Sequence, residues 1–167
     1  MKKLLLNEQG GVHWIISICG GVIFSIMAFC IFIDSWSIDQ VDRVATDKVH
    51  QLNLDIYSML SVEHTAYTTG FKIDDETAAL SLFRKGLQSR FNLDSSLRPT
   101  SSDGALTGPV QILNFRVIDD TELPYTDGYG RQMQFPGIVA DLLLPVKTPM
   151  YGISGNHHVL ITTEIYR

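Results

Sequence analysis

The sequence predicts an α+β chain, with one long N-terminal helix, a second helix, and a small antiparallel sheet of three to four strands. Three observations predict this fold class. Residues 12–33 contain no charged side chain. Apolar residues then recur at steps of three and four as far as about residue 62. From residue 110 onward, branched and aromatic residues are concentrated in separate short stretches, which is typical of strands.

The uncharged run at residues 12–33 is long enough to be a retained transmembrane helix. Its 22 residues correspond to about 33 Å of helix, and a hydrocarbon core is about 30 Å thick. The apolar part of a signal peptide is usually only about 7 to 15 residues long. No small residue stands directly before Cys19 or Cys30, as a lipoprotein-type cleavage site would require. We therefore divide the chain into a cytoplasmic leader (1–11), a transmembrane helix (12–33) and an extracytoplasmic part (34–167).

The charges on either side of the run predict its orientation. The first 33 residues carry two lysines and one glutamate, whereas the remainder carries 11 of the 13 basic and 17 of the 18 acidic side chains. Because lysine and arginine favour the cytoplasmic side of a membrane, we expect the N-terminus in the cytoplasm. Trp14 and Trp36 lie near the two ends of the run, as in an aromatic belt.

An amphipathic stalk is expected to follow the transmembrane helix without a break. Residues 22–69 contain neither glycine nor proline, so one helix is predicted from about residue 12 to about residue 62, with Gly70 near or beyond its end. We expect its apolar face to pack against the β-rich part or against a neighbouring subunit. This stalk stripe consists of Val41, Ala45, Val49, Leu52 and Ile56.

A second helix is predicted to begin near Asp74 or Asp75, since either carboxylate can cap free backbone N–H groups. Its expected apolar stripe is Leu80, Phe83, Leu87 and Phe91. Residues 94–109 have the composition of a loop.

The C-terminal part is predicted to form strands at residues 110–118, 137–146 and 158–166, with a further short strand near residues 131–135. The third stretch alternates, which places one set of side chains on a common face. That set is Val159, Ile161, Thr163 and Ile165. A wide turn between the last two strands is expected from Pro149, Gly152, Gly155 and Asn156.

Motifs for metal binding are weak in this sequence. The histidines are His13, His50, His64, His157 and His158. His157 and His158 are adjacent on a predicted strand and so point to opposite faces, while a helix would hold His50 and His64 about 21 Å apart. The acidic residues Asp119, Asp120, Glu122 and Asp127 lack the spacing of a calcium loop. We interpret the histidines as surface residues and these acidic residues as turn residues, and we expect no metal and no cofactor.

Catalytic signatures are equally weak. The chain contains neither a G-x-S-x-G elbow nor a phosphate-binding glycine loop, and the part after residue 33 has no cysteine that could serve as a nucleophile. The acidic balance of that part argues against nucleic acid as a ligand. We therefore expect a protein that is not an enzyme, and we assign no catalytic residue.

The transmembrane helix carries a ridge of small residues that favours close packing of another helix. Gly21 is flanked by serines four positions before and after it, which places all three on one side of the helix. Small side chains at such positions allow two helix backbones to approach each other within a membrane. We define the small-residue ridge as Ser17, Gly20, Gly21, Ser25 and Ala28.

The N-terminal layout is similar to that of a known family. The stretch Asn7-Glu8-Gln9-Gly10-Gly11, a long apolar helix, an amphipathic stalk and a small β-rich part resemble type IV pilin-like proteins, and among them the TadE-like minor pilins. The resemblance covers mainly residues 1–60 and rests on layout more than on individual letters. It implies assembly through helix packing, and cleavage by a prepilin peptidase after Gly10 or Gly11. The family tends to place a glutamate about five residues into the mature helix, where this chain has Ile15 and Ile16.

Two classes of function fit these observations. The first is a structural, non-enzymatic subunit of a pilus, secretion or conjugation apparatus, in contact with membrane lipid and with copies of itself or related pilin-like subunits, and part of a surface filament. The second is a single-pass, membrane-anchored extracellular binding module.

Overall fold

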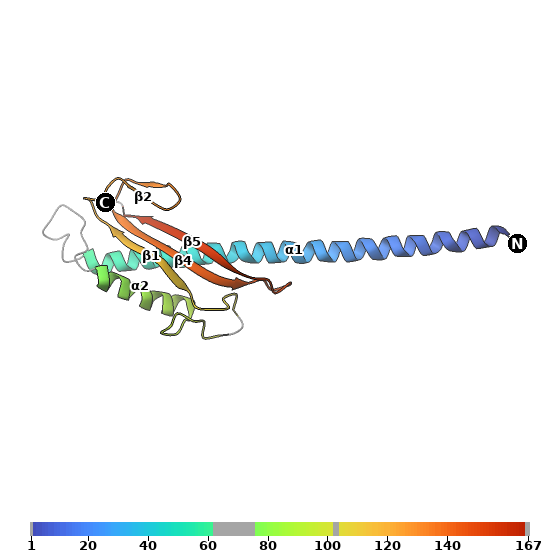
Figure 1. The fold of residues 1–167 in the computed structure, drawn as a ribbon, viewed down its shortest axis with the longest axis horizontal. Coiled ribbons are helices and arrows are strands. Elements are labelled where there is room, and N and C mark those ends of the chain that lie inside the picture. Colours follow the sequence, from blue (N-terminus) through green and yellow to red (C-terminus); the bar gives the residue numbers. More distant parts are fainter. Residues whose placement is uncertain (1, 62–75, 102–103, 166–167) are drawn as a thin grey trace.

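The computed structural model describes residues 2–61, 76–101 and 104–165, and it confirms the predicted α+β fold (Figure 1). Helix α1 (Lys2–Ser61) runs along the whole molecule. Its C-terminal half packs against helix α2 (Glu76–Phe91) and the sheet, whereas its N-terminal half extends away from them.

Helix α1 begins ten residues earlier than the sequence analysis placed its start. The leader at residues 2–11 is helical, including the backbone of Gly10 and Gly11. Leucine is a strong helix former, and glycine costs only about 1 kcal/mol relative to alanine, so two glycines followed by a long apolar run do not end the helix. The predicted end near residue 62 agrees with Ser61, and Gly70 lies outside the described residues.

The N-terminal half of α1 is long and apolar enough to cross a membrane, and it is the one helix of the described residues that passes this test. Its large apolar side chains are exposed all round the helix, among them Trp14, Ile23, Phe24 and Phe32. An apolar surface of this extent is rare on soluble monomers. The structure therefore agrees with a helix that can anchor the chain in a bilayer.

Helix α2 packs closely against the stalk. Its buried residues are Ala79, Phe83 and Leu87, while Leu80 and Phe91, which we expected on the same stripe, are only half-buried. The stripe is shifted toward Ala79 because a small side chain lets the two helices approach. Gly86 serves the same purpose, since a Cβ atom at this position would lie 2.1 Å from Cδ1 of Leu52. The predicted capping residues Asp74 and Asp75 lie outside the described residues.

The main sheet has three antiparallel strands in the order β1–β4–β5, namely β1 (Gln111–Ile118), β4 (Gly137–Lys147) and β5 (Ser154–Glu164). A second, two-stranded sheet pairs β2 (Tyr125–Thr126) with β3 (Gln132–Met133). The sequence analysis predicted β1, β3, β4 and β5 but not β2, which is only two residues long.

The predicted turn between the last two strands was partly wrong. Pro149 and Gly152 lie in the turn at residues 148–153, but Gly155 and Asn156 belong to β5 and pair with Val146 and Pro145 of β4. Antiparallel pairing therefore continues past residues that usually mark turns. The result is a long β4–β5 hairpin whose turn reaches along α1 toward its N-terminal half (Figure 1).

The hydrophobic core lies between the main sheet and the two helices. The predicted alternation of β5 is confirmed, because Val159, Ile161, Thr163 and Ile165 are all buried. Two polar side chains of α1 meet this strand. Nδ2 of Asn53 donates a hydrogen bond to Oγ1 of Thr163 at 3.0 Å, and Nδ1 of His50 lies 3.1 Å from the same oxygen. Because Asn53 and Thr163 are fully buried, a one-residue slip of β5 would leave them unpaired.

Candidate functional site

The small-residue ridge has no partner inside the described part of this chain. All five of its residues are exposed, and a Cβ atom built on Gly20 or Gly21 would meet no heavy atom within 4 Å. The hydroxyl of Ser25 donates a hydrogen bond to the carbonyl oxygen of Gly21 at 2.8 Å. The Ser25 hydroxyl is therefore hydrogen-bonded within its own helix. The ridge has no long side chain that would keep a neighbouring helix at a distance. Ser17 also borders a shallow hollow beside His13 and Trp14.

The stalk stripe, in contrast, is covered by the chain itself. Ala45, Val49, Leu52 and Ile56 are buried in the core, and Val41 is half-buried at its edge. The sheet and α2 therefore occupy the face for which the sequence allowed either the chain's own β-rich part or a neighbouring subunit. The two surfaces of α1 therefore differ: the stalk stripe is covered by the sheet and α2, whereas no described part of the chain covers the small-residue ridge.

A polar clamp joins the β4–β5 turn to α1 at the end of the uncharged run. Asp34 is 6% exposed, and its two carboxylate oxygens accept hydrogen bonds from the backbone N–H groups of Met150 (2.8 Å) and Tyr151 (3.0 Å). Beyond Asp34, the hydroxyl of Tyr151 donates to the carbonyl oxygen of Met27 at 3.3 Å. We call Asp34 and the turn at residues 148–153 the hairpin clamp.

The clamp is supported farther along the stalk. Nε2 of His157 lies 3.0 Å from Oδ1 of Asp42. Together with the contacts of His50 and Asn53 to Thr163, these bonds tie the hairpin to α1 along its length. The sequence analysis did not find the clamp. Its only local signal was Asp34, which is the first charged residue after the uncharged run.

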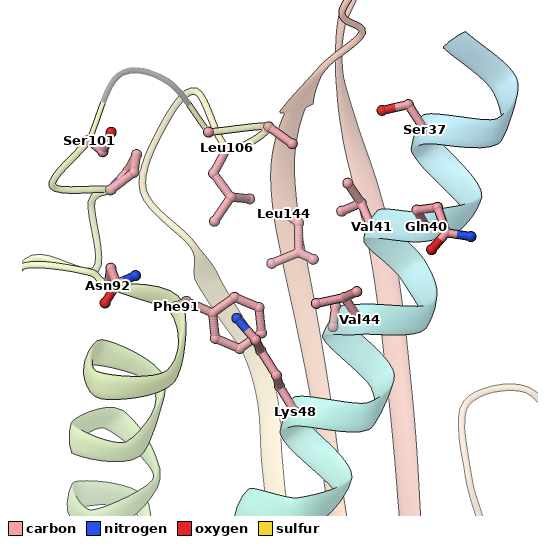
Figure 2. A pocket seen from close by; sticks show the side chains of 14 residues that line it. Ser37, Gln40, Val41, Val44, Lys48, Phe91, Asn92, Ser101, Leu106 and Leu144 are labelled. Carbon is pink, nitrogen blue, oxygen red and sulfur yellow. The ribbon is translucent and has the colours of Figure 1, made fainter. Parts of the chain in front are cut away.

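A groove opens beside the stalk, on the side of the core nearer the uncharged run (Figure 2). It has a volume of about 550 Å³ and a mostly apolar lining that includes Val41, Val44, Leu106 and Leu144. Lys48 crosses one end of it (Figure 2). Its amine donates a hydrogen bond to the carbonyl oxygen of Arg90 at 2.7 Å and lies 4.8 Å from the centroid of the Phe91 ring.

This groove could not have been predicted from the sequence. Its lining comes from α1, the end of α2, the connection before β1, and β4, which are far apart in the chain. Chemically, an apolar lining with an engaged ammonium group suits an apolar side chain or a small apolar ligand better than an anion.

The histidines lie at separate places. His157 contacts α1, whereas His158 points to the other face, where Nε2 lies 2.6 Å from Asp141 and Nδ1 lies 2.8 Å from the hydroxyl of Tyr129. The opposite orientation agrees with the strand geometry predicted from sequence. Within the part of the chain that the structure describes, no three His, Cys, Asp or Glu side chains gather closely enough to hold a metal ion. His64 lies outside that part.

The acidic loop before β3 is organised by Asp127. One carboxylate oxygen accepts hydrogen bonds from the N–H groups of Tyr129 and Arg131, both at 2.9 Å, and the other accepts from the hydroxyl of Thr162 at 2.8 Å. Burial alone would raise the pKa of Asp127, but the hydrogen bonds from Thr162, Arg131 and Tyr129 and the charge of Arg131 lower it below its usual value. Asp119 similarly accepts a bond from the N–H of Thr121. Both carboxylates stabilise turns, as predicted.

Comparison with known proteins adds no relative. No family model matches the chain, and neither the curated proteins nor the solved structures contain a match to it. The fold and the sites described above define the class: an α+β chain in which, among the described residues, one helix is long and apolar enough to cross a membrane, and the second half of that helix packs into the core.

Proposed function

We propose that this chain is a membrane-anchored, non-enzymatic structural subunit of a pilus, secretion or conjugation apparatus, and that it assembles through the N-terminal half of α1. One observation carries the proposal. The same uninterrupted helix carries an exposed, uncharged run at residues 12–33 with an open small-residue ridge, and a second half whose stalk stripe is buried in the folded part. Because the helix is continuous, packing of its N-terminal half within the membrane would also determine the position of the folded part outside the membrane.

The layout of residues 1–60, which resembles that of type IV pilin-like and TadE-like proteins, supports the same proposal. In this view Gly10 and Gly11 mark a processing site, and the ridge contacts copies of the chain or related pilin-like subunits. The mature N-terminus, read by mass spectrometry of the protein from its native membrane, tests the processing. A chain that begins at Met1 would remove processing from the proposal while leaving helix packing intact.

The proposed topology is a single span with the N-terminus in the cytoplasm. Lys2 and Lys3 precede the run, and the acidic folded part follows it. In a Gly10→Ala, Gly11→Ala background that keeps the leader attached, protease added to intact cells is expected to degrade an epitope tag placed after residue 167 while sparing a tag before residue 1. Detergent should make both tags accessible. Protection of the C-terminal tag in intact cells would reverse the orientation.

Association through the ridge is expected to depend on Gly21. The change Gly21→Ile keeps the helix apolar, so insertion should persist, but the added side chain would hold two backbones apart. Loss of two or three contacts of about 0.6 kcal/mol each would weaken association roughly tenfold. Disulfide cross-linking in native membranes can measure this loss if a cysteine is placed on the ridge by Ala28→Cys.

The helix offers matched controls for this experiment. Cys19 and Cys30 lie on the side of α1 opposite Gly21, since successive residues are about 100° apart, and both are changed to serine in the cross-linking background. Ile23→Phe adds bulk on that same opposite side and should leave the Ala28→Cys cross-link unchanged. Equal effects of Gly21→Ile and Ile23→Phe would contradict packing through the ridge.

The groove favours a second candidate function, a membrane-anchored extracellular binding module. Its volume and apolar lining would suit a small apolar ligand or an apolar side chain of another protein. If the Ala28→Cys chain forms no cross-link with any partner in its native membrane, and the exterior part binds a soluble ligand, this second function replaces the first.

A further inference from the structure

We propose that the turn of the β4–β5 hairpin is a second membrane contact, and that its apolar side chains insert into the lipid interface beside the transmembrane helix. This inference rests on the membrane span in the proposed function, but it does not require assembly. The partner is the phospholipid bilayer itself, at the level where headgroups meet acyl chains.

The turn exposes apolar side chains that nothing in the described chain covers. Met150 is 50% exposed, Tyr151 47% and Ile153 64%. Three large apolar residues within four positions would be unfavourable in water at the end of a hairpin, and Pro149 adds further apolar surface. Such a cluster is characteristic of a surface that meets a partner or a membrane.

The position of the turn along α1 selects the membrane. Tyr151 hydrogen-bonds to the carbonyl of Met27, which lies within the uncharged run, about 9 Å along the helix from its end at residue 33. The backbone N–H of Tyr151 is bound by Asp34, just past that end, so if residues 12–33 span a bilayer the Tyr151 ring lies across the outer edge of the hydrocarbon core, where it meets the headgroups. Trp36 is exposed on α1 near the same level. Tyrosine and tryptophan are enriched at this depth because one end of each ring is apolar and the other can form hydrogen bonds.

The clamp makes this position tolerable for a peptide turn. Backbone N–H groups cost several kcal/mol when they enter lipid without a partner. At this turn the N–H groups of Met150 and Tyr151 are bound by Asp34, and that of Ile153 donates to Oγ1 of Thr148 at 3.0 Å. The hydroxyl of Tyr151 is also satisfied. These four donors of the turn are thus bonded within the chain, while its apolar side chains remain exposed.

Lys147 completes the interfacial character of the turn. It is exposed at the end of β4, directly before the turn, and its Cε atom lies near Gly152. A lysine at this depth can place its methylene groups beside lipid and its ammonium group among phosphates. The sequence analysis treated the stretch from Pro149 to Asn156 as a wide turn between strands and assigned it no function.

Depth-dependent quenching of tryptophan fluorescence tests the proposal. The native tryptophans are replaced by Trp14→Phe and Trp36→Phe, and one reporter is introduced by Met150→Trp. The full chain is placed in phosphatidylcholine nanodiscs at one chain per disc, with bromine either near the headgroup or near the end of the acyl chains. We expect the reporter to emit at shorter wavelength than in water and to be quenched more strongly by bromine near the headgroup.

Two further reporters separate failure of this proposal from failure of the anchoring. Phe24→Trp, in the middle of the run, should be quenched more strongly by bromine near the chain ends. Leu54→Trp, an exposed stalk position about 30 Å along α1 from Asp34, should not be quenched by either lipid.

Quenching at Phe24→Trp without quenching at Met150→Trp would overturn the hairpin contact and leave the membrane span in place. Lack of quenching at both positions would overturn the span and the hairpin contact together. If Met150→Trp were shielded only in discs that hold several chains, and without lipid quenching, the turn would contact a second copy instead of lipid. That result would also overturn the proposal.

Discussion

The variant Leu52→Asp is expected to unfold the part of the chain formed by the stalk, α2 and the sheet. Leu52 is only 5% exposed and its side chain lies against Gly86 of α2. Truncating a buried leucine to alanine costs about 2 to 5 kcal/mol, and a carboxylate there adds the cost of burying a charge. The total is comparable to the whole stability of a small domain, which is about 5 to 15 kcal/mol. The expected result is loss of the cooperative thermal transition, measured by circular dichroism in detergent or nanodiscs.

The same helix provides the control for this variant. Leu54 is 42% exposed and two residues away, so Leu54→Asp changes the charge and the helix propensity equally without entering the core. Its effect should remain within about 0.5 kcal/mol. A wild-type melting temperature in Leu52→Asp, or an equal loss in both variants, would contradict the packing of the stalk against α2.

The variant Gly137→Ala is expected to break the end of the main sheet. A Cβ atom on Gly137 would lie 2.0 Å from the backbone carbonyl oxygen of Thr163, which no rotation of a side chain can relieve. Strands β4 and β5 would have to separate at the pair formed by Gly137 and Glu164. Overpacking of this kind costs about 3 kcal/mol, and denaturant unfolding of the purified protein would measure it.

A second strand glycine gives the matched comparison. Gly155 lies in β5 near the other end of the same hairpin, and a Cβ atom there would meet nothing within 4 Å. Gly155→Ala should therefore be neutral or stabilise the fold by about 0.5 kcal/mol, because it restricts the unfolded chain. Similar unfolding midpoints for the two variants would show that the strands can adjust and that the contact at Gly137 is not restrictive.

Much of the secondary structure could be predicted because its causes are local. The stalk stripe repeats with the helical period over Val41 to Ile56, and the alternation from Val159 to Ile165 repeats with the period of a strand. The errors arise where contacts between distant parts of the chain override the local pattern. Gly155 and Asn156 are common turn residues, but pairing with β4 keeps them extended. Leu80 was predicted on the buried stripe of α2, whereas the structure buries Ala79, which faces α1.

The candidate sites were harder to predict because they depend on contacts between distant parts of the chain. The ridge from Ser17 to Ala28 is a local pattern and is visible in the sequence, although its partner is not. The groove and the clamp are not visible, because Asp34 and Tyr151 are 117 positions apart.

The sequence by itself determined where the chain can cross a membrane and which stretches form helices and strands. Hydropathy and periodicity act over neighbouring residues, so they need no knowledge of the fold. Only the tertiary structure decided that α1 is buried on its stalk stripe by its own sheet and open on its ridge. It alone brought the β4–β5 turn beside Met27 and Asp34, since hydrogen bonds and close packing between distant residues exist only after the hairpin has docked on the helix.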